Sequence, residues 1–307
     1  MEDDQLIQQW ELEVKEINDR FTCHPSQQRW SSDEKWERLE KLGRGGYGEV
    51  WLQQCTTGPR VGDLRAVKEI PKDFRQSSED GHAEVRHQEL SALIKFSHQQ
   101  YRDYFVSSFG WFQTPEALFI TMQYFPHGDL QCHITKALPN DEACTIIRQI
   151  LQGLSFMHQN KFAHRDLKPA NILVQEKGPN WWVKLSDFGC SKEATTLQTT
   201  VGTPPYWAPE LCHIFTRADE DSHDWIENRT YSFQVDIWSA GVIAFRLVTG
   251  VLPFGSNLHS ELYCYVRREG SLPSSLLLTD QSRPFMEWLM SRSPGDRPTA
   301  VQALVHP

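Results

Sequence analysis

The sequence predicts an α+β fold in two lobes, a small one that is mainly β-structure and a larger one that is mainly helical. Two patterns lead to this prediction. Between residues 36 and 122, short apolar and β-branched runs alternate with turns, whereas beyond residue 129 apolar residues recur at helical spacing. The length of 307 residues, 39% of them hydrophobic, is enough for one large core or two modest ones.

Composition excludes several classes of protein. The net charge of −9 disfavours a nucleic-acid binder, which needs a basic face. Seven scattered cysteines without a CxxC spacing argue against a disulfide framework and a zinc site. The longest apolar stretch, residues 237–254, is interrupted by Arg246, and the amino terminus lacks the pattern of a secretory signal. We therefore expect no membrane span and an intracellular protein, cytoplasmic and/or nuclear.

Residues 1–35 are expected to precede the main domain. An amphipathic helix is predicted over residues 5–21, because apolar residues recur there at spacings of three and four: Ile7, Trp10, Val14, Ile17 and Phe21. Residues 22–33, with Pro25 and several Ser and Gln, are expected to form a linker. The helix has two interpretations: it packs on the main domain, or it pairs with a partner or a second copy.

The first lobe begins with a glycine-rich turn between strands. Gly43, Gly45 and Gly48 form a GxGxxG pattern, and residues 49–52 after it resemble a strand instead of the helix that a dinucleotide-binding fold requires. The strand over residues 64–70 carries Lys68 among apolar neighbours, where an ammonium group needs a partner. A helix predicted over residues 81–96 offers two candidates, Glu84 and Glu89.

Two further strands, residues 105–106 and 118–122, are expected to complete the first lobe. A helix is then predicted from the cap residues at 140–143 along an apolar stripe to Met157, and another over residues 235–249.

Two polar turns lie beside short apolar strands after residue 162. The first runs from His164 to Asn171 and the second comprises residues 187–189. A single aspartate in such a turn is usually structural, but Asp166 and Asp187 occur here with Lys168 and Asn171. Carboxylate and amide oxygens are ligands that Mg²⁺ prefers, and this ion usually arrives with substrate phosphates. The turns therefore predict a phosphate-handling site.

These turns resemble the catalytic and metal-binding loops of the eukaryotic protein kinases. The glycine turn, the Lys68 strand, residues 202–210 and residues 296–300 match the other kinase motifs in order. The resemblance implies the two-lobed protein kinase fold over residues 36–307, with an N-lobe at about 36–122, a hinge at about 123–128 and a C-lobe at about 129–307. It also implies that Asp236 holds the catalytic loop and that Arg297 pairs with Glu210.

Through the resemblance, each site residue acquires an expected role. Asp166 accepts the hydroxyl proton, Lys168 steadies the γ-phosphate, and Lys68, held by Glu89, contacts the α- and β-phosphates of ATP. Asn171 and Asp187 hold Mg²⁺. The expected nucleotide-binding residues are Gly43, Gly45, Gly48, Val50, Ala66, Lys68, Met122, Gln123, Phe125, Asp129, Leu173 and Asp187. For Asp129 a helix N-cap is an equal alternative to a ribose contact.

The sequence of the first turn favours transfer to serine or threonine, because Lys168 follows Asp166 as in serine/threonine kinases, within which the chain looks most similar to the calcium/calmodulin-dependent and checkpoint types. Arg165 beside Asp166 indicates control by a phosphorylated activation segment, with Thr199 as the first candidate and Thr200 as the second. Thr203 is expected to be a structural hydroxyl near Asp166 and Lys168. The expected partners are ATP and protein substrates. Two alternatives remain: a pseudokinase scaffold that binds partners without catalysis, and a small-molecule kinase.

Overall fold

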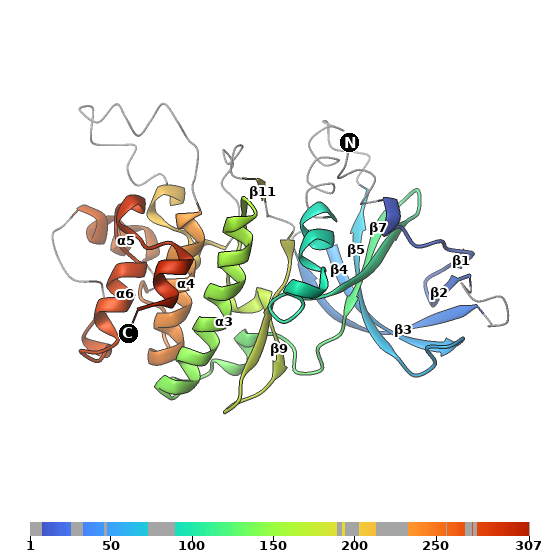
Figure 1. The fold of residues 1–307 in the computed structure, drawn as a ribbon, viewed down its shortest axis with the longest axis horizontal. Helices are drawn as coiled ribbons and strands as arrows, with labels where there is room; N and C mark the ends of the chain where they lie inside the picture. The colour runs from blue at the N-terminus through green and yellow to red at the C-terminus, as the bar shows by residue number, and fades with distance from the viewer. Residues whose placement is uncertain are drawn as a thin grey trace. The chain divides into compact units, whose positions relative to one another are not determined.

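A computed structural model describes residues 8–25, 33–45, 48–72, 90–188, 192–193, 203–212, 233–255, 257–267, 272 and 275–306. The chain divides into two compact units (Figure 1). The first comprises Met1–Arg102 and Val106–Phe125, and the second Asp103–Phe105 and Pro126–Pro307. The first is built on a β-sheet and the second on helices, so the predicted α+β class is confirmed.

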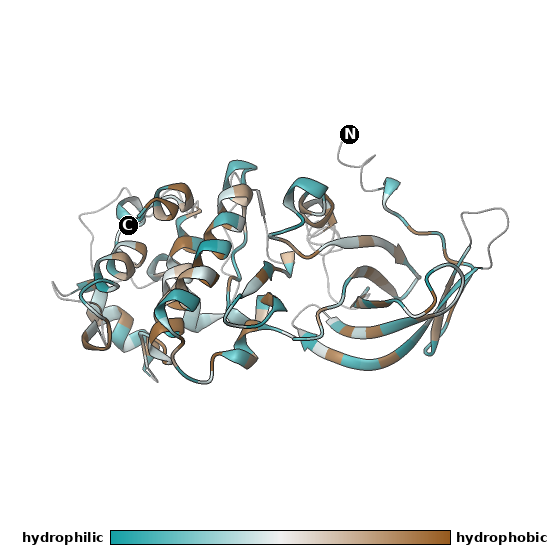
Figure 2. Ribbon diagram, turned by 60° about the horizontal axis from the view of Figure 1, so that its bottom comes forward, coloured by the Kyte–Doolittle hydropathy of each residue, from teal (hydrophilic) through white to brown (hydrophobic). Residues whose placement is uncertain are grey.

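The first unit is organised around one seven-stranded antiparallel sheet, in the order β1-β2-β3-β4-β5-β7-β6. The strands are β1 (Glu16–Ile17), β2 (Phe21–His24), β3 (Glu34–Gly45), β4 (Gly48–Thr57), β5 (Leu64–Pro71), β6 (Ser108–Gln113) and β7 (Ala117–Gln123). Hydrophilic and hydrophobic bands follow one another along these strands in Figure 2, as expected when successive side chains point to opposite faces. Residues 90–96 are helical and are followed by η1 (Gln99–Tyr101).

The amphipathic helix predicted over residues 5–21 is wrong from residue 10 onward, although residues 8–9 are helical. Residues 16–17 and 21–24 form strands β1 and β2, and β2 pairs with β3. Residues 10–12 lie along β6 at the opposite edge: Leu12 N donates to Trp111 O (2.6 Å) and Trp111 N donates to Trp10 O (3.1 Å). We call residues 10–24 the N-terminal strap, because this one segment pairs with both edges of the sheet.

Packing explains why the strap is not helical. Leu12, Val14 and Ile17 contact a buried cluster of the sheet that contains Val67, Phe112, Ala117 and Phe119. The expectation that the segment packs on its own domain is thus confirmed, although it does so as strands. The linker predicted over residues 22–33 is also wrong at its start, because Thr22, Cys23 and His24 belong to β2.

A buried polar cluster fixes the strap to the sheet. Arg65 of β5 is only 2% exposed, stacks on Trp36 (4.1 Å to the ring centre) and donates to Gln53 Oε1 (2.9 Å). Its Nη2 lies 3.2 Å from His24 Nε2, while His24 Nδ1 lies 2.8 Å from Glu13 O. Burial, followed by the charge of Arg65, lowers the pKa of His24 from 6.5 to about 4. A neutral imidazole that accepts from Arg65 and donates to Glu13 satisfies both contacts.

The strand predicted at residues 105–106 is also wrong, because the strand of this region is β6, two residues later. Phe105 makes only an isolated bridge, to Leu185 within the second unit. Gly110 in β6 resembles a turn residue in the sequence, but a Cβ there would lie 2.7 Å from Trp10 O and 2.8 Å from Leu12 Cγ. This glycine, at φ +115°, allows the strap to approach β6.

The second unit contains five described α-helices, several 3₁₀ turns and two small antiparallel sheets. The helices are α3 (Asn140–Gln159), α4 (Gln234–Thr249), α5 (Leu258–Arg267), α6 (Arg283–Leu289) and α7 (Ala300–Leu304). The two helices predicted from the sequence correspond to α3 and α4. The small sheets pair β9 (Ile172–Glu176) with β10 (Trp182–Leu185), and β8 (Phe162–Ala163) with β11 (Lys192–Glu193).

Helix α4 forms the centre of the second core. It is buried from Val235 to Phe245 and packs against α3 and α6. Helix α3 turns its apolar stripe to the same core. In the part of the chain that the structure describes, no helix has both the length and the apolar composition needed to cross a membrane.

Candidate functional site

The first polar turn lies between β8 and β9 and includes η3 (Pro169–Asn171). Asp236, at the start of α4, holds the backbone of this turn: its carboxylate accepts from His164 N (2.9 Å) and Arg165 N (2.8 Å). His158 Nε2 lies 2.9 Å from the same carboxylate. Arg165 has φ +69°, an unfavourable conformation for a side-chain-bearing residue, so the anchor holds a strained backbone. The expected role of Asp236 is confirmed.

The carboxylate of Asp236 is fully buried, and its hydrogen-bond and charge partners determine whether it is protonated. Burial alone would raise its pKa, but the hydrogen bond and charge of His158, the charge of His164 and the hydrogen bond from Arg165 N lower the pKa below its ordinary value. Asp236 is therefore an anion that fixes the turn. His158 was not predicted as a site residue, and its place in the last turn of α3 is its only signal in the sequence.

Asp166 is oriented by three side chains. Its Oδ2 accepts from Lys168 Nζ (2.7 Å) and Asn171 Nδ2 (3.1 Å), and its Oδ1 accepts from Thr203 Oγ1 (2.9 Å). Lys168 Nζ also donates to Thr203 Oγ1 (2.6 Å), which confirms the predicted contact of this hydroxyl with both charged residues. The turn and residue 203, which are 37 positions apart, thus meet at one carboxylate.

The second turn is joined to the first through Asn171. Ser186 N (2.9 Å) and Ser186 Oγ (3.0 Å) both donate to Asn171 O. The next residue, Asp187, adopts φ +59°, and Phe188 is buried against Phe105 and His164. Gly189 lies outside the described residues. Hydrogen bonds through Asn171 therefore connect the two turns.

The donor chemistry of these turns fits Mg²⁺. Asn171 uses its amide nitrogen on Asp166 O (2.8 Å) and Asp166 Oδ2, which leaves its amide oxygen as the available donor atom. Together with the carboxylate of Asp187 this gives hard oxygen ligands. No group of three His, Cys, Asp or Glu side chains suited to a metal occurs among the described residues. A metal held here would therefore need further ligands from a bound molecule.

In the first unit, Lys68 lies in the middle of β5 and is 8% exposed. Ala66 pairs with Met122, and Lys68 pairs with Val50 and Ile120. Since side chains alternate along a strand, Ala66 and Lys68 share the face opposite to Val67 and the strap. Lys68 has an interaction partner in the structure. Its predicted partner Glu89 lies outside the described residues, as does Glu84.

The glycine turn joins β3 and β4, whose ends pair Gly45 with Gly48. Gly48 has φ +150°, and a Cβ there would overlap the carbonyl oxygen of Glu69, so only glycine fits. A Cβ added at Gly43 would have no other atom within 4 Å. The space beside Gly43 is therefore open.

The remaining predicted nucleotide-binding residues are divided between the two units. In the first, Gln123 N donates to Ser107 O (2.9 Å) and Phe125 is buried. In the second, Asp129 pairs with Leu173 in an isolated bridge and accepts from Cys132 N (3.2 Å) as the N-cap of η2 (Leu130–His133). The N-cap alternative for Asp129 is therefore confirmed, and its ribose contact stays a prediction.

Of the regulatory candidates, Arg165 is buried and has an interaction partner. Thr199 and Thr200 lie outside the described residues. Thr203 begins the described segment that continues through η6 (Pro204–Tyr206) and η7 (Pro209–Cys212).

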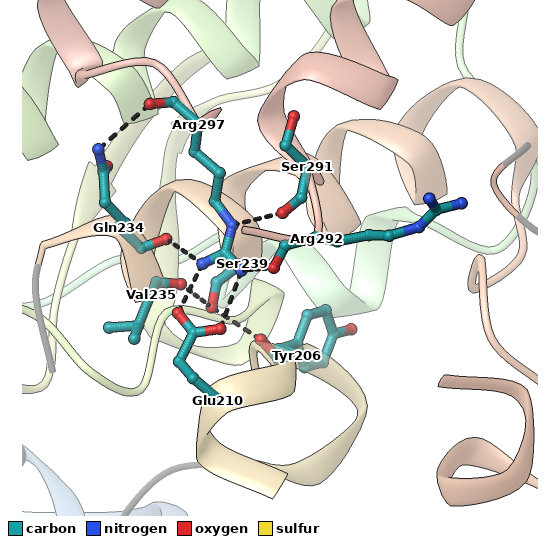
Figure 3. A network of polar contacts seen from close by, with 8 residues as sticks. All are labelled: Tyr206, Glu210, Gln234, Val235, Ser239, Ser291, Arg292 and Arg297. Atoms are coloured by element: carbon teal, nitrogen blue, oxygen red, sulfur yellow. Dashed lines mark hydrogen bonds and ion pairs between the residues drawn. The ribbon is translucent and has the colours of Figure 1, made fainter. Parts of the chain in front are cut away.

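The ion pair between Arg297 and Glu210 fixes that segment to the helices (Figure 3). Arg297 Nη1 and Nη2 donate to the two Glu210 carboxylate oxygens at 2.6 and 2.8 Å. Its other N–H groups donate to backbone oxygens of Ser291 (2.8 Å), Gln234 (3.1 Å) and Arg292 (3.2 Å). All five guanidinium donors are thus used, and the predicted pair is confirmed.

Comparison with known proteins agrees with this geometry. The family model described as "Protein kinase domain" matches residues 36–307. Calcium/calmodulin-dependent protein kinase type 1 of Caenorhabditis briggsae is 31% identical over 281 residues, covering 89% of this chain and 72% of that protein. Serine/threonine-protein kinase RAD53 of Saccharomyces cerevisiae is 32% identical over 279 residues, covering 87% and 32%. Mitogen-activated protein kinase kinase kinase A of Dictyostelium discoideum is 30% identical over 282 residues, covering 89% and 28%.

These relatives carry the names of several kinase groups, and their identities to this chain are alike, so the similarity defines the family without selecting a group. The family match spans both units and includes every predicted catalytic residue. The chain therefore belongs to the eukaryotic protein kinases of the serine/threonine type, the enzymes that transfer phosphate from ATP to protein hydroxyl groups.

Proposed function

We propose that this chain phosphorylates serine and threonine residues of proteins in a Mg²⁺-dependent reaction, with Asp166 as the base. The observation that carries the proposal is the cradle of Lys168, Asn171 and Thr203 around the Asp166 carboxylate. Phosphoryl transfer needs alignment and charge neutralisation more than covalent help from the protein. A carboxylate fixed by three donors supports alignment of an acceptor hydroxyl.

Each residue of the site has a separate role in the proposed reaction. Asp166 accepts the proton of the attacking hydroxyl, and Lys168, already bound to Asp166 and Thr203, contributes its positive charge to the γ-phosphate. Lys68, with Glu89, contacts the α- and β-phosphates. Asn171 and Asp187 hold Mg²⁺ through their side-chain oxygens, and that ion neutralises phosphate charge when bound.

Variants of Asp166 and Lys68 test this proposal. Asp166→Asn should reduce kcat by roughly 100-fold or more, because a positioned base alone contributes about that factor. Lys68→Met should also lower kcat strongly, because the positive charge on the α- and β-phosphates is lost. Thr203→Val should lower kcat, and Thr203→Ser should restore it, since only the hydroxyl bridges Lys168 and Asp166. Chelation of Mg²⁺ should abolish transfer to peptides and to the protein itself.

A binding scaffold without catalysis is the alternative function. It is disfavoured by the presence of Lys68, Asp166 and Asp187 together. Purified protein that binds ATP with Mg²⁺, measured by calorimetry, but phosphorylates neither itself nor any peptide of a serine/threonine array would establish the scaffold instead. Phosphorylation of a small metabolite without any peptide would favour the small-molecule kinase.

We further propose that phosphorylation of Thr199, or secondarily Thr200, raises activity. The support is the adjacency of Arg165 to Asp166 and the threonine-rich sequence before Thr203. A phosphate adds strong acceptors that pair with arginine and order a segment. Phosphatase treatment should lower the rate, and a Thr199→Ala/Thr200→Ala variant should be insensitive to it. An equal rate before and after treatment, in both proteins, would contradict this proposal.

A further inference from the structure

A cavity of about 370 Å³ lies among helices α3, α4, α6 and α7 of the second unit (Figure 1). Protein interiors contain few voids larger than a water molecule, whereas small-molecule sites start at about 300 Å³. Alanine side chains face the cavity from three of these helices, at Ala143 of α3, Ala244 of α4 and Ala303 of α7, and their small size leaves the space open. The cavity lies wholly within the second unit and includes no residue of the polar turns described above.

The walls of the cavity are amphiphilic. Every buried residue that lines it is apolar: Ala143, Ile147, Leu151, Ala244, Met286 and Ala303. Every exposed residue that lines it carries a polar group: Asn140, Asp141, Cys144, Arg148, Thr279 and Gln281. The interior therefore suits an apolar body and the mouth suits a polar group, which is the usual division in a site for a small molecule.

Two charged side chains lie at the mouth, both on α3. Arg148 is exposed, and in the described part of the chain its guanidinium forms no hydrogen bond or ion pair. Asp141 precedes it by seven residues, which is about 10 Å along a helix and too far for a direct pair. His306, which also lines the cavity, packs on two aromatic rings of α6. A guanidinium offers planar paired donors that match a carboxylate, so Arg148 is the place at this mouth where an anion fits.

We propose that this cavity is a binding site for a hydrophobic monocarboxylate, whose apolar body fills the space between the helices and whose carboxylate pairs with Arg148. The charge of Arg148 selects the head group, because a neutral group of the same shape forms a weaker hydrogen bond. The apolar wall selects the body, because each buried methylene adds affinity until the cavity is full. The inference goes beyond phosphoryl transfer and does not depend on it, since no lining residue belongs to the proposed catalytic site.

Calorimetric titration of the full chain with straight-chain alkanoic acids, from hexanoate to dodecanoate, tests the chemistry of the site. The acids are used below the concentrations at which they aggregate, and each is compared with its primary amide. The dissociation constant should fall roughly fourfold for each added methylene and then level off when the cavity is full. Each acid should bind roughly tenfold more tightly than its amide, the size of a charge-assisted hydrogen bond.

Alkylation of two cysteines locates the bound acid. Cys144 is exposed at the mouth of the cavity, whereas Cys132 is exposed in η2 and does not line it. With the acid at about ten times its dissociation constant, alkylation of Cys144 by iodoacetamide should slow roughly tenfold. Alkylation of Cys132 should keep its rate, as measured by mass spectrometry of the two peptides.

Three variants identify the contacts. Arg148→Gln should bind each acid and its amide about equally. Lys177→Gln, which removes an exposed positive charge of the same unit that does not line the cavity, should keep the preference for the acid. Ala303→Leu fills part of the cavity and should weaken the binding of acid and amide alike. Because Arg148 and Lys177 are exposed, their variants keep the test valid even if Ala303→Leu fails to fold.

Several results would overturn the inference. These are a failure of every acid to bind, equal affinity of the native protein for acid and amide, full reactivity of Cys144 with the acid bound, and a preference for the acid that survives in Arg148→Gln. Protection of Cys144 that rises with protein concentration in the absence of acid would identify a second copy of the chain as the occupant instead. Protection by phosphatidylcholine vesicles alone would identify a membrane surface. None of these results bears on peptide phosphorylation, which tests the proposed function separately.

Discussion

Replacement of Glu210 by Gln is expected to destabilise the second unit more than the removal of a solvent-exposed charge does. The Arg297 side chain is fully buried and that of Glu210 is 16% exposed, so the variant leaves a buried guanidinium without its counter-charge. Removing one partner of a buried pair costs about 3 to 5 kcal/mol. For a unit of this size, such a loss lowers Tm by roughly 6 to 20 °C.

The assay is calorimetric unfolding of four proteins: native, Glu210→Gln, Arg297→Met and the double variant. The double variant contains no buried charge that lacks its partner. Its loss of stability should therefore be smaller than the sum of the losses in the two single variants. The exposed pair Arg60–Asp63, at 3.2 Å, provides the control, and its loss should cost less than about 1 kcal/mol. A Tm change under about 2 °C for Glu210→Gln, or strict additivity, would refute the reasoning.

Three further changes test other parts of the structure. Asp236→Asn should lower kcat by roughly tenfold or more while ATP binding remains, because the anion that fixes the strained backbone is lost; an unchanged kcat in steady-state kinetics would contradict this. Gly110→Ala should lower the Tm of the first unit, because its Cβ meets the strap; an equal Tm would show that the contact is dispensable. The free energy of unfolding of the first unit should fall by about 3 kcal/mol as the pH decreases from 6.5 to 4, because His24 binds a proton more readily in the unfolded chain. His24→Gln should flatten this pH dependence, as measured by urea titrations.

Much of the second unit was predictable because its signals are local. The stripe of α3 repeats at helical spacing along the helix, and the polar turn at 164–171 carries its chemistry in consecutive residues. The pairs Asp236 with the catalytic turn and Arg297 with Glu210 connect distant residues, and they followed from the kinase resemblance instead of from spacing. Nothing local in the sequence signals the contact of Arg246 with Tyr206, because it depends on how a turn meets a helix 40 residues later.

The errors concentrate in the N-terminal strap. Trp10, Val14 and Ile17 fit a helical spacing, but Leu12 and Val14 also fit the alternation of a strand, so local periodicity does not decide between them. The decisive partner is β6, about a hundred residues later, whose own glycine resembles a turn. This contact between distant residues explains why the helix prediction is wrong at residues 10–12.

The pairing of the strap with β6 also has a consequence for synthesis. The backbone of Trp111, which residues 10–12 bind, leaves the ribosome about a hundred residues after them. At about 5–20 residues per second, this interval is roughly 5 to 20 s. During it, Leu12, Val14 and Ile17 lack the surface that later covers them, because Phe112, Ala117 and Phe119 do not yet exist. The part of the strap that binds β6 is thus made well before its partner strand, whereas β2 meets β3 after only a few further residues.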